Sequence, residues 1–306
     1  MPSNIQASAQ ESSPEGFRRD PIFDMYGLGG SGTIWPTGYR SACVFTFDVD
    51  TEALWVLRGN DDPIAHSMGQ FEPKVGTPLL LGLLGEFGIK ATFFVPGWVA
   101  EKYPAMVESM LLGGHAIGHH GYLHENARSF KTAEEEEAAM VKGIEAIERV
   151  TGTRPRGFRS PFWEFSRHTI GLLERHGFEY TSDLMDTLLP DYHIIGGRVS
   201  SMINLPTHWL LSDKTHFYYD SQRSKSVHPC SQALSILIEE LEGIRAYGGL
   251  FTLTMHPQVS GRPSRILMLR RLIQHIIHLG DVWMPSPAEL TKYWVASYPP
   301  ADTFSD

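Results

Sequence analysis

Short β-like runs alternate with helical patterns along most of this sequence, from about residue 40 onward. The runs ACVFTF (42–47), KATFFVP (90–96) and LFTLTMHP (250–257) are rich in β-branched and aromatic residues, which is typical of buried strands. The stretches between such runs carry apolar residues at helical spacing, as in TPLLLGLLGEFG (77–88). This alternation predicts an α/β fold with a mostly parallel sheet, either open or closed as a barrel.

Polar side chains gather where the predicted strands end. Functional groups at the carboxyl ends of several strands are typical of an α/β barrel active site, and this pattern favours one catalytic domain over two. We place that domain, a distorted (β/α) barrel, at residues 39–298. The polar groups that follow strands are, in chain order, Asp48 and Asp50, His119 to His124, Arg159 to Trp163, Asp183, His208 and His256.

The two ends of the chain lie outside the predicted domain. Residues 1–38 form an N-terminal arm, whose first twenty residues lack the apolar core of a signal peptide, and residues 299–306 form a tail. No stretch has the length needed to span a bilayer. Cys43 lies in an apolar run far from Cys230, which favours buried free thiols in a reducing compartment. We therefore expect a cytoplasmic protein with no membrane association.

The charge balance narrows the range of partners. Lys and Arg number 26 against 35 Asp and Glu, so the formal net charge is −9 at pH 7. A net acidic surface repels phosphate backbones and anionic lipids. We expect a small-molecule substrate and no nucleic acid partner.

One histidine-rich stretch suggests a metal site. His120 and His124 are four residues apart, a spacing that brings two rings together on a helical turn. Asp48 and Asp50, in the segment FDVDTE, end a predicted strand and can both point into one pocket. An Asp with two His leaves coordination positions open, as a catalytic divalent metal requires. Taken alone, each element also fits a solvated loop.

Other candidates have equally plausible structural explanations when each is considered alone. His256 precedes a proline at a strand end and could be a turn histidine. Arg159 could pair with a backbone carbonyl, and Trp163 and Trp209 could be core residues or could stack on a flat ring or a sugar. His115 and His119 lie off the face of the other two histidines and are expected to be structural.

The combination of these elements resembles the polysaccharide deacetylase superfamily, also called the NodB-homology or carbohydrate esterase family 4 fold. Its motifs T-F-D-D-G, H-x-x-x-H, R-x-P-[YF] and L-x-x-H correspond here to TFDVD, HGYLH, RSPF and LTMH, in the same order over roughly residues 40–295. The resemblance implies a NodB-type (β/α) barrel.

This sequence departs from the broad family because Val49 separates the two acids. The segments HGYLHEN, PFWEFS, LPTHWLLSD and HPQVSGRP resemble a subgroup of cyclic-imide hydrolases, deacetylase-fold allantoinases and peptidoglycan-deacetylase-like proteins. Those allantoinases lack part of the metal triad, whereas His124 is present here. The subgroup also implies a homo-oligomer, a dimer or a tetramer.

The resemblance implies a role for each motif residue. Asp50, His120 and His124 bind one divalent metal, most readily Zn²⁺, with Co²⁺, Mn²⁺ or Ni²⁺ as alternatives. Asp48 is the general base, and Arg159 keeps its carboxylate ionised. His256 is the general acid toward the leaving nitrogen. No motif identifies the acid that tunes His256, and Asp183 is the candidate.

The expected reaction is hydrolysis of a non-peptide C–N bond by a water that the metal activates. Opening of a small cyclic amide, imide or ureide competes with N-deacetylation of an amino-sugar polymer, and an inactive binding homologue is a third alternative. Inserts at residues 51–75 and 184–201 are expected to roof a closed pocket through Trp55, Phe71, Leu188, Leu189 and Tyr192. The expected substrate contacts are Pro161, Trp163, Glu164 and Trp209.

Overall fold

The computed structural model describes residues 34–218 and 227–300, and these residues belong to one compact unit. A curled sheet runs through the molecule in the strand order β6-β7-β5-β4-β3-β2-β1-β8, with β9 added beside β1. All pairs are parallel except β6 with β7. Within the described ranges no pairing joins β8 to β6, so the predicted (β/α) barrel is present in a distorted form that does not close.

The strands are shortest at β4, β5 and β9, with two residues each, and longest at β1, with eight. They are β1 (Ser41–Asp48), β2 (Thr92–Val95), β3 (Ala116–His119), β4 (Gly157–Phe158), β5 (Tyr180–Thr181), β6 (Asp191–Ile195), β7 (Arg198–Asn204), β8 (Leu250–Met255) and β9 (Val282–Trp283). Because neighbouring strands are parallel, their carboxyl ends share one edge, and the polar residues that follow β1, β3, β4, β5 and β8 meet there.

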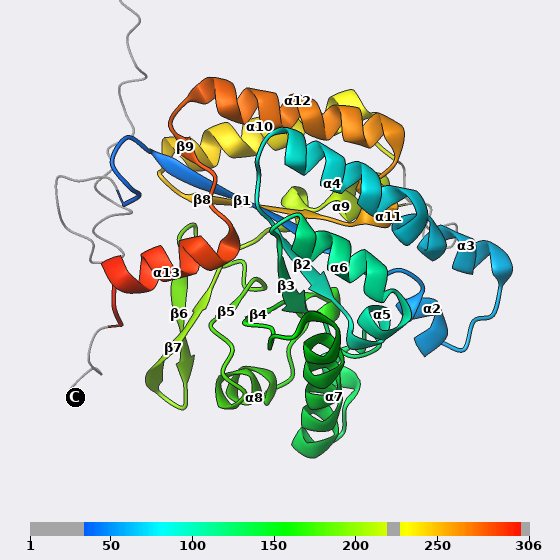
Figure 1. Cartoon of the computed structure of the whole chain (residues 1–306). Helices are drawn as coiled ribbons and strands as arrows, with labels where there is room; N and C mark the ends of the chain where they lie inside the picture. Colours follow the sequence, from blue (N-terminus) through cyan, green and yellow to red (C-terminus); the bar gives the residue numbers. More distant parts are fainter. Residues whose placement is uncertain (1–33, 219–226, 301–306) are drawn as a thin grey trace, which may run out of the picture. The chain divides into compact units, whose positions relative to one another are not determined.

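Helices cover the outer faces of the sheet (Figure 1). Helices α4, α10 and α12 pack together near β1 and β8, while α6 and α7 pack beside β3. The helices are α2 (Ala53–Leu57), α3 (Pro63–Phe71), α4 (Thr77–Glu86), α5 (Gly97–Lys102), α6 (Pro104–Leu112), α7 (Ala133–Thr151), α8 (Thr169–Arg175), α9 (Asp213–Phe217), α10 (Cys230–Ala246), α11 (Pro257–Ser260), α12 (Pro263–Leu279) and α13 (Pro287–Ser297). A π-helical turn, Glu72–Gly76, joins α3 to α4.

The core follows the predicted apolar patterns. Strand β1 is buried along its whole length, and Phe47 stacks on Phe93 of β2 with ring centroids 4.9 Å apart. On α4 the predicted stripe faces inward, since Leu80, Leu83 and Leu84 are all buried. Burial of these apolar side chains is the main source of stability for the sheet that positions the site.

The run of four glutamates at the start of α7 is only partly a solvated face. Glu134 and Glu135 are exposed, but Glu136 is buried and accepts hydrogen bonds from the hydroxyls of Ser166 and Thr169. Glu136 therefore ties α7 to the start of α8. A buried carboxylate needs such donors, which the run of four glutamates did not reveal.

The two predicted lids have different positions. The insert at 51–75 contains α2 and α3 and supplies Trp55 to a cavity at the strand ends. The insert at 184–201 instead leads into strands β6 and β7, and Tyr192 donates a hydrogen bond to the Tyr298 carbonyl. The Leu188 carbonyl accepts a hydrogen bond from the backbone N–H at the start of β8. The site lies at the opposite end of that strand, its carboxyl end. The prediction that this second insert roofs the site is wrong.

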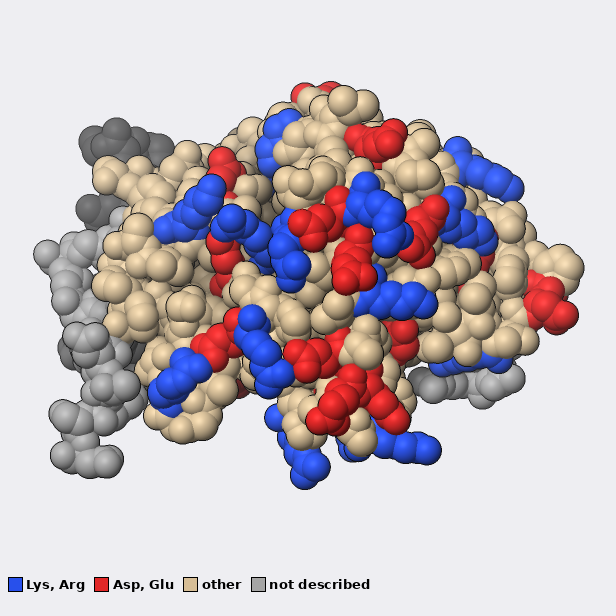
Figure 2. Space-filling view, turned by 60° about the horizontal axis from the view of Figure 1, so that its bottom comes forward, with Lys and Arg blue, Asp and Glu red and all other residues tan. Residues whose placement is uncertain are grey.

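Acidic and basic side chains alternate over the face of the molecule shown in Figure 2. Surface ion pairs of this kind include Arg149 with Glu101 and Arg175 with Glu137. Within the described residues no helix is both long and apolar enough to cross a membrane. The predicted arm lies outside the described residues up to residue 33, and most of the predicted tail, 301–306, lies outside them as well.

Candidate active site

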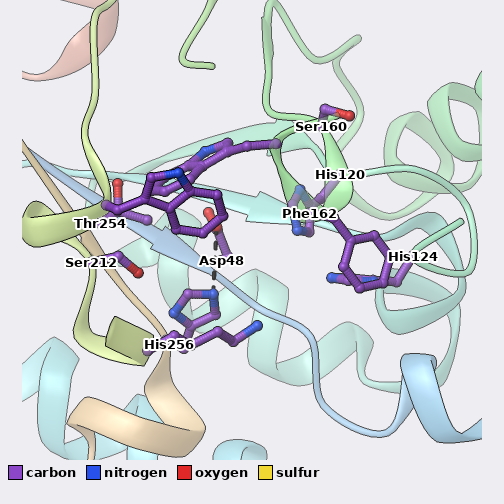
Figure 3. Close-up of a pocket in the computed structure, with 11 residues that line it drawn as sticks. Asp48, His120, His124, Ser160, Phe162, Ser212, Thr254 and His256 are labelled. Carbon is purple, nitrogen blue, oxygen red and sulfur yellow. Dashed lines mark ion pairs between the residues drawn. The ribbon is translucent and has the colours of Figure 1, made fainter. Parts of the chain in front are cut away.

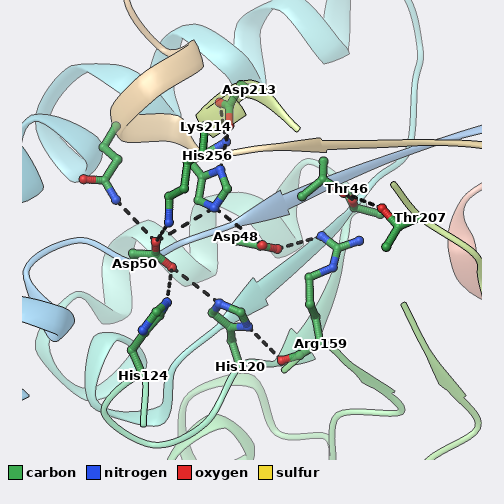
Figure 4. A network of polar contacts seen from close by, with 12 residues as sticks. Thr46, Asp48, Asp50, His120, His124, Arg159, Thr207, Asp213, Lys214 and His256 are labelled. Atoms are coloured by element: carbon green, nitrogen blue, oxygen red, sulfur yellow. Dashed lines mark hydrogen bonds and ion pairs between the residues drawn. The ribbon is translucent and has the colours of Figure 1, made fainter. Parts of the chain in front are cut away.

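The three predicted metal ligands converge at the carboxyl edge of the sheet. The Oδ1 atom of Asp50 lies 3.5 Å from Nε2 of His120 and 3.5 Å from Nε2 of His124. All three side chains are buried, and one donor atom from each lies within 4.8 Å of the other two. Figure 4 shows Asp50, from the segment after β1, and the two imidazoles, from the loop after β3, pointing toward one another.

Hydrogen bonds from other groups orient two of the three ligands. Nδ1 of His120 donates to the Arg159 carbonyl at 2.8 Å, so Nε2 keeps its lone pair toward Asp50. On the other side, the Lys214 ammonium donates to Oδ2 of Asp50 at 2.7 Å, leaving Oδ1 toward the two histidines. The carboxylate is thus shared between a lysine and the triad.

The chemistry of this donor set fits a divalent cation. Oδ1 of Asp50 is a buried carboxylate oxygen with no hydrogen-bond donor among the described residues, which is a costly arrangement unless a cation lies beside it. Two imidazoles and one carboxylate leave coordination positions open. Asp50, His120 and His124 could therefore hold a metal ion without rearrangement of their supports.

The pKa values of the ligands follow from burial and charge. Burial lowers the pKa of His124 to about 3, which leaves its imidazole neutral, the form that binds metals. Burial opposes the ionised form of Asp50, but the Lys214 ammonium and the neighbouring His124 and His120 together outweigh it and hold the pKa of Asp50 well below its usual range. For His120, burial is outweighed by Asp48 and Asp50, and the pKa is raised. The site therefore attracts positive charge.

Asp48 is the second carboxylate of the edge, and it is separate from the triad. Nη1 of Arg159 donates to its Oδ1 at 2.7 Å, as predicted, and Arg159 is itself anchored by Ser182 through Nε and Nη2. Burial alone would raise the pKa of Asp48, but the Arg159 guanidinium, together with His120 and His256, lowers it below the ordinary value. Asp48 is consequently an ionised carboxylate at neutral pH, with its other oxygen directed at the cavity.

His256 faces Asp48 across the cavity. Its Nε2 lies 3.6 Å from Oδ2 of Asp48, and the two side chains point toward each other in Figure 3. Its Nδ1 lies 2.6 Å from Oδ1 of Asp213, and Oδ2 of the same carboxylate accepts a hydrogen bond from the His256 backbone N–H at 2.7 Å. The Ser260 hydroxyl donates to the same carboxylate at 2.6 Å. The arrangement suits a histidine that gains and loses a proton at Nε2.

Asp183, the sequence candidate for the acid beside His256, is the wrong residue. Its carboxylate accepts hydrogen bonds from the backbone of Ser160 and Ser182, and it stays beneath the loop after β4. Asp213 is the acid beside His256 because α9 packs against β8. The spacing of residues in the sequence does not predict this contact. The only available signal was the final Asp of LPTHWLLSD, one of the segments that resemble the subgroup.

Several residues around the site have the left-handed backbone conformation that non-glycine residues rarely adopt. They are Thr51 (φ 44°), His124 (φ 61°), Phe162 (φ 63°) and Trp163 (φ 54°). The backbone of Thr51 is held by the buried Glu72, whose Oε2 accepts from its N–H at 3.1 Å. Burial, together with the nearby Asp50, raises the pKa of Glu72 well above its ordinary value. Strained conformations of this kind concentrate at functional sites.

A cavity of about 150 Å³ opens beside Asp48 and His256. Its walls include Phe162, Trp163 and Trp209, and the two indoles meet edge to face with centroids 4.6 Å apart. Figure 3 shows Phe162 lying over His124 at the margin of this cavity. Trp163 and Trp209 thus lie where the sequence placed them, and Phe162 was missed.

Two predicted substrate contacts do not line this cavity. Pro161 faces a separate small cavity beside His119, because the turn that starts at Ser160 directs it away from the strand ends. The carboxylate of Glu164 accepts a hydrogen bond from the Asn126 amide at 2.8 Å. Contact of either residue with a substrate therefore stays a prediction. His115 and His119 bond to backbone groups, to Ala91 N–H and to the Met140 carbonyl respectively, and neither joins the triad.

Comparison with known proteins places this geometry among related chains. Residues 60–181 match the family model for polysaccharide deacetylase, a range that includes His120, His124 and Arg159. A peptidoglycan deacetylase of Helicobacter pylori is 31% identical over 269 aligned positions, which cover 78% of this chain and 90% of that protein.

Solved structures share the same fold. A polysaccharide deacetylase candidate from Mycobacterium smegmatis is 36% identical and superposes with a TM-score of 0.82, covering 90% of this chain and 98% of the other. The crystal structure of Puue allantoinase gives a TM-score of 0.79 at 21% identity, with 93% of this chain and 99% of that one covered. This second likeness concerns the fold alone.

Proposed function

The chain belongs to the polysaccharide deacetylase family, and from that premise we propose that it is a metal-dependent hydrolase of C–N bonds other than peptide bonds. The family supports a hydrolase acting on C–N bonds. The observation that carries the metal dependence is the buried Asp50–His120–His124 triad, in which Oδ1 of Asp50 has no hydrogen-bond donor among the residues that the structure describes. The opposed pair of Asp48 and His256 supports acid–base chemistry beside that triad.

Asp48 is the proposed general base. It is ionised because of Arg159, and one of its oxygens faces the cavity where an attacking water would lie. Proton transfer to Oδ2 increases the nucleophilicity of that water as it attacks the scissile carbonyl carbon. Arg159 contacts Asp48, Ser182 and the Phe94 ring, and these contacts fix the base rigidly.

His256 is the proposed general acid. The Asp213 carboxylate accepts from Nδ1 and stabilises the imidazolium form, so that Nε2 can donate its proton to the leaving nitrogen as the C–N bond breaks. Asp48 gains one proton from the attacking water and His256 gives one proton to the leaving nitrogen, so the protons of the hydrolysis balance.

Asp50, His120 and His124 are the proposed metal ligands. When bound, a divalent ion such as Zn²⁺ supplies Lewis-acid polarisation of the carbonyl and lowers the pKa of water at the site. The remaining three side chains, Asp48, His256 and Arg159, are left free of the ion for positioning and proton transfer.

For the substrate we propose a small cyclic amide, imide or ureide. The support is the size and lining of the cavity: about 150 Å³ is small beside the roughly 300–1,000 Å³ of sites for drug-sized ligands. Phe162, Trp163 and Trp209 offer aromatic faces to a flat ring. Apolar walls with a few convergent polar groups suit a neutral ring that offers few atoms for binding.

N-deacetylation of an amino sugar is the second candidate. It is favoured by the 31% identity to the Helicobacter pylori peptidoglycan deacetylase over 90% of that protein. The same base, acid and metal ligands perform either reaction, because both hydrolyse an amide. The two candidates differ in what surrounds the bond, and exposed Trp209 could equally stack on a sugar.

Steady-state kinetics on matched panels decide between them. One panel contains succinimide, glutarimide, hydantoin and allantoin, and the other contains N-acetylated chito-oligomers of increasing length. Turnover of a ring with no reaction on the oligomers supports the first candidate. A rise of kcat/KM with oligomer length and no ring turnover replaces it with the second. No turnover on either panel by metal-loaded protein would overturn the proposed hydrolase.

A further inference from the structure

A second cavity adjoins the one between Asp48 and His256. Its volume is about 280 Å³, and it lies on the other side of Asp50. The two cavities share His124, Phe162 and Lys214 in their walls, so a ligand bound over the triad can extend from one into the other. The proposed chemistry uses only the first cavity, and it leaves the second without a role.

The walls of the second cavity are cationic at one end and apolar at the other. Arg58 and Lys214 supply two positive charges, while Leu54 and Trp55 supply apolar surface. Asp50 is its only acidic wall residue in the described ranges, and both of its oxygens already face other groups. Figure 4 shows Lys214 reaching toward Asp50.

Arg58 is the side chain in this cavity that is available for a ligand. It lies at the end of α2, is exposed, and forms no ion pair with any residue in 34–218 or 227–300. An unpaired guanidinium beside a lysine, over an aromatic wall, matches a planar carboxylate attached to a carbon skeleton. Neutral and cationic groups gain nothing from the same walls.

We propose that the second cavity binds a carboxylate of the substrate through Arg58, with Lys214 beside it, and so selects substrates that carry an anionic group next to the scissile amide. This proposal rests on the proposed C–N hydrolase function, and it applies to either substrate class. A ring ureide with an acidic side chain and an amino sugar with a lactyl group at O3 present the same carboxylate chemistry.

Two matched substrate pairs test the proposal, because the members of each pair differ mainly by one carboxylate. The ring pair is hydantoin and hydantoin-5-acetate, and the sugar pair is N-acetylglucosamine and N-acetylmuramic acid. In the class that reacts, the acidic member should have the higher kcat/KM. Arg58→Gln should lower that preference by about 10-fold to 100-fold, chiefly through KM, and leave the neutral member unchanged. Arg58→Lys should restore part of it.

Arg271→Gln is the matched control, since Arg271 is an exposed arginine on α12 that lines neither cavity. Arg58 is preferred to Lys214 as the test position because Lys214 also holds Asp50. Equal kcat/KM for both members of the reacting pair, or an unchanged preference in Arg58→Gln, would overturn the proposal.

Binding measurements separate failure of this proposal from failure of the proposed function. In metal-loaded Asp48→Asn protein, calorimetric titration should give a lower Kd for the acidic member than for the neutral one, and Arg58→Gln should abolish the difference. If that difference appears while no substrate turns over, the carboxylate site stands and the hydrolase assignment fails. If turnover occurs and the acidic member binds no better, the carboxylate site fails alone.

Discussion

Replacing Asp213 by Asn tests the assignment of His256 most specifically. The Asp213 carboxylate accepts three hydrogen bonds of 2.6–2.7 Å, two from His256 and one from Ser260. An Asn amide keeps the shape but directs an NH₂ group at one of these donors. If the NH₂ faces Nδ1, the ring must present a lone pair there, and the imidazolium form is lost.

The expected loss follows from that change of protonation. Without a proton to give at Nε2, the leaving nitrogen departs unassisted, and kcat should fall by about 10²–10⁴-fold, the range for general acid–base catalysis. That corresponds to about 3–5 kcal/mol of activation free energy. The metal content should stay at the wild-type level, because Asp213 contributes no atom to the triad.

The assay is steady-state hydrolysis of whichever substrate reacts, together with elemental analysis and a thermal melt of each variant. Asp183→Asn is the matched control: it removes a buried carboxylate of the same edge that does not touch His256. We expect it to keep kcat within a few fold. A large loss in Asp183→Asn with none in Asp213→Asn would refute the geometry described here.

Three further outcomes are expected. Asp48→Asn should retain the metal and lose about 10²–10⁴-fold in kcat, whereas Asp50→Asn should lose metal affinity; elemental analysis that gives the reverse pattern contradicts both roles. His124→Ala should lower metal occupancy, and unchanged occupancy would exclude it as a ligand. Burial raises the pKa of Asp183 to about 7, so its contribution to stability is present below about pH 4 and is lost as the pH rises through 7. Asp183→Asn should therefore melt at a higher temperature than wild type at pH 8. The difference in melting temperature should shrink toward pH 4. Equal melting temperatures at pH 8 would show that burial of the ionised carboxylate is not costly.

Much of the site could be predicted from the sequence because its parts are local. His120 and His124 are close along the chain, and Asp48 and Asp50 end one strand, so short spacing plus the parallel strand order brings the ligands to one edge. The pairing of Arg159 with Asp48 was predicted from motif resemblance, and the structure contains it at 2.7 Å.

The supports of the site could not be predicted, because they depend on contacts between distant segments. Asp213 and Lys214 are consecutive residues of the five-residue helix α9, yet one holds His256 and the other holds Asp50. These two contacts join residues that are 43 and 164 positions apart in the sequence, and no periodic pattern predicts contacts over such separations. The directions in which the side chains of Pro161 and Phe162 point could not be predicted either, because they depend on the positive φ of Phe162.

The most direct test of the proposed metal-dependent hydrolysis is a titration of chelated protein with metal. The Asp50–His120–His124 triad predicts that protein stripped of metal, as verified by elemental analysis, is inactive and that about one equivalent of Zn²⁺ or Co²⁺ per chain restores hydrolysis. Full activity in protein shown to contain no metal would contradict the account.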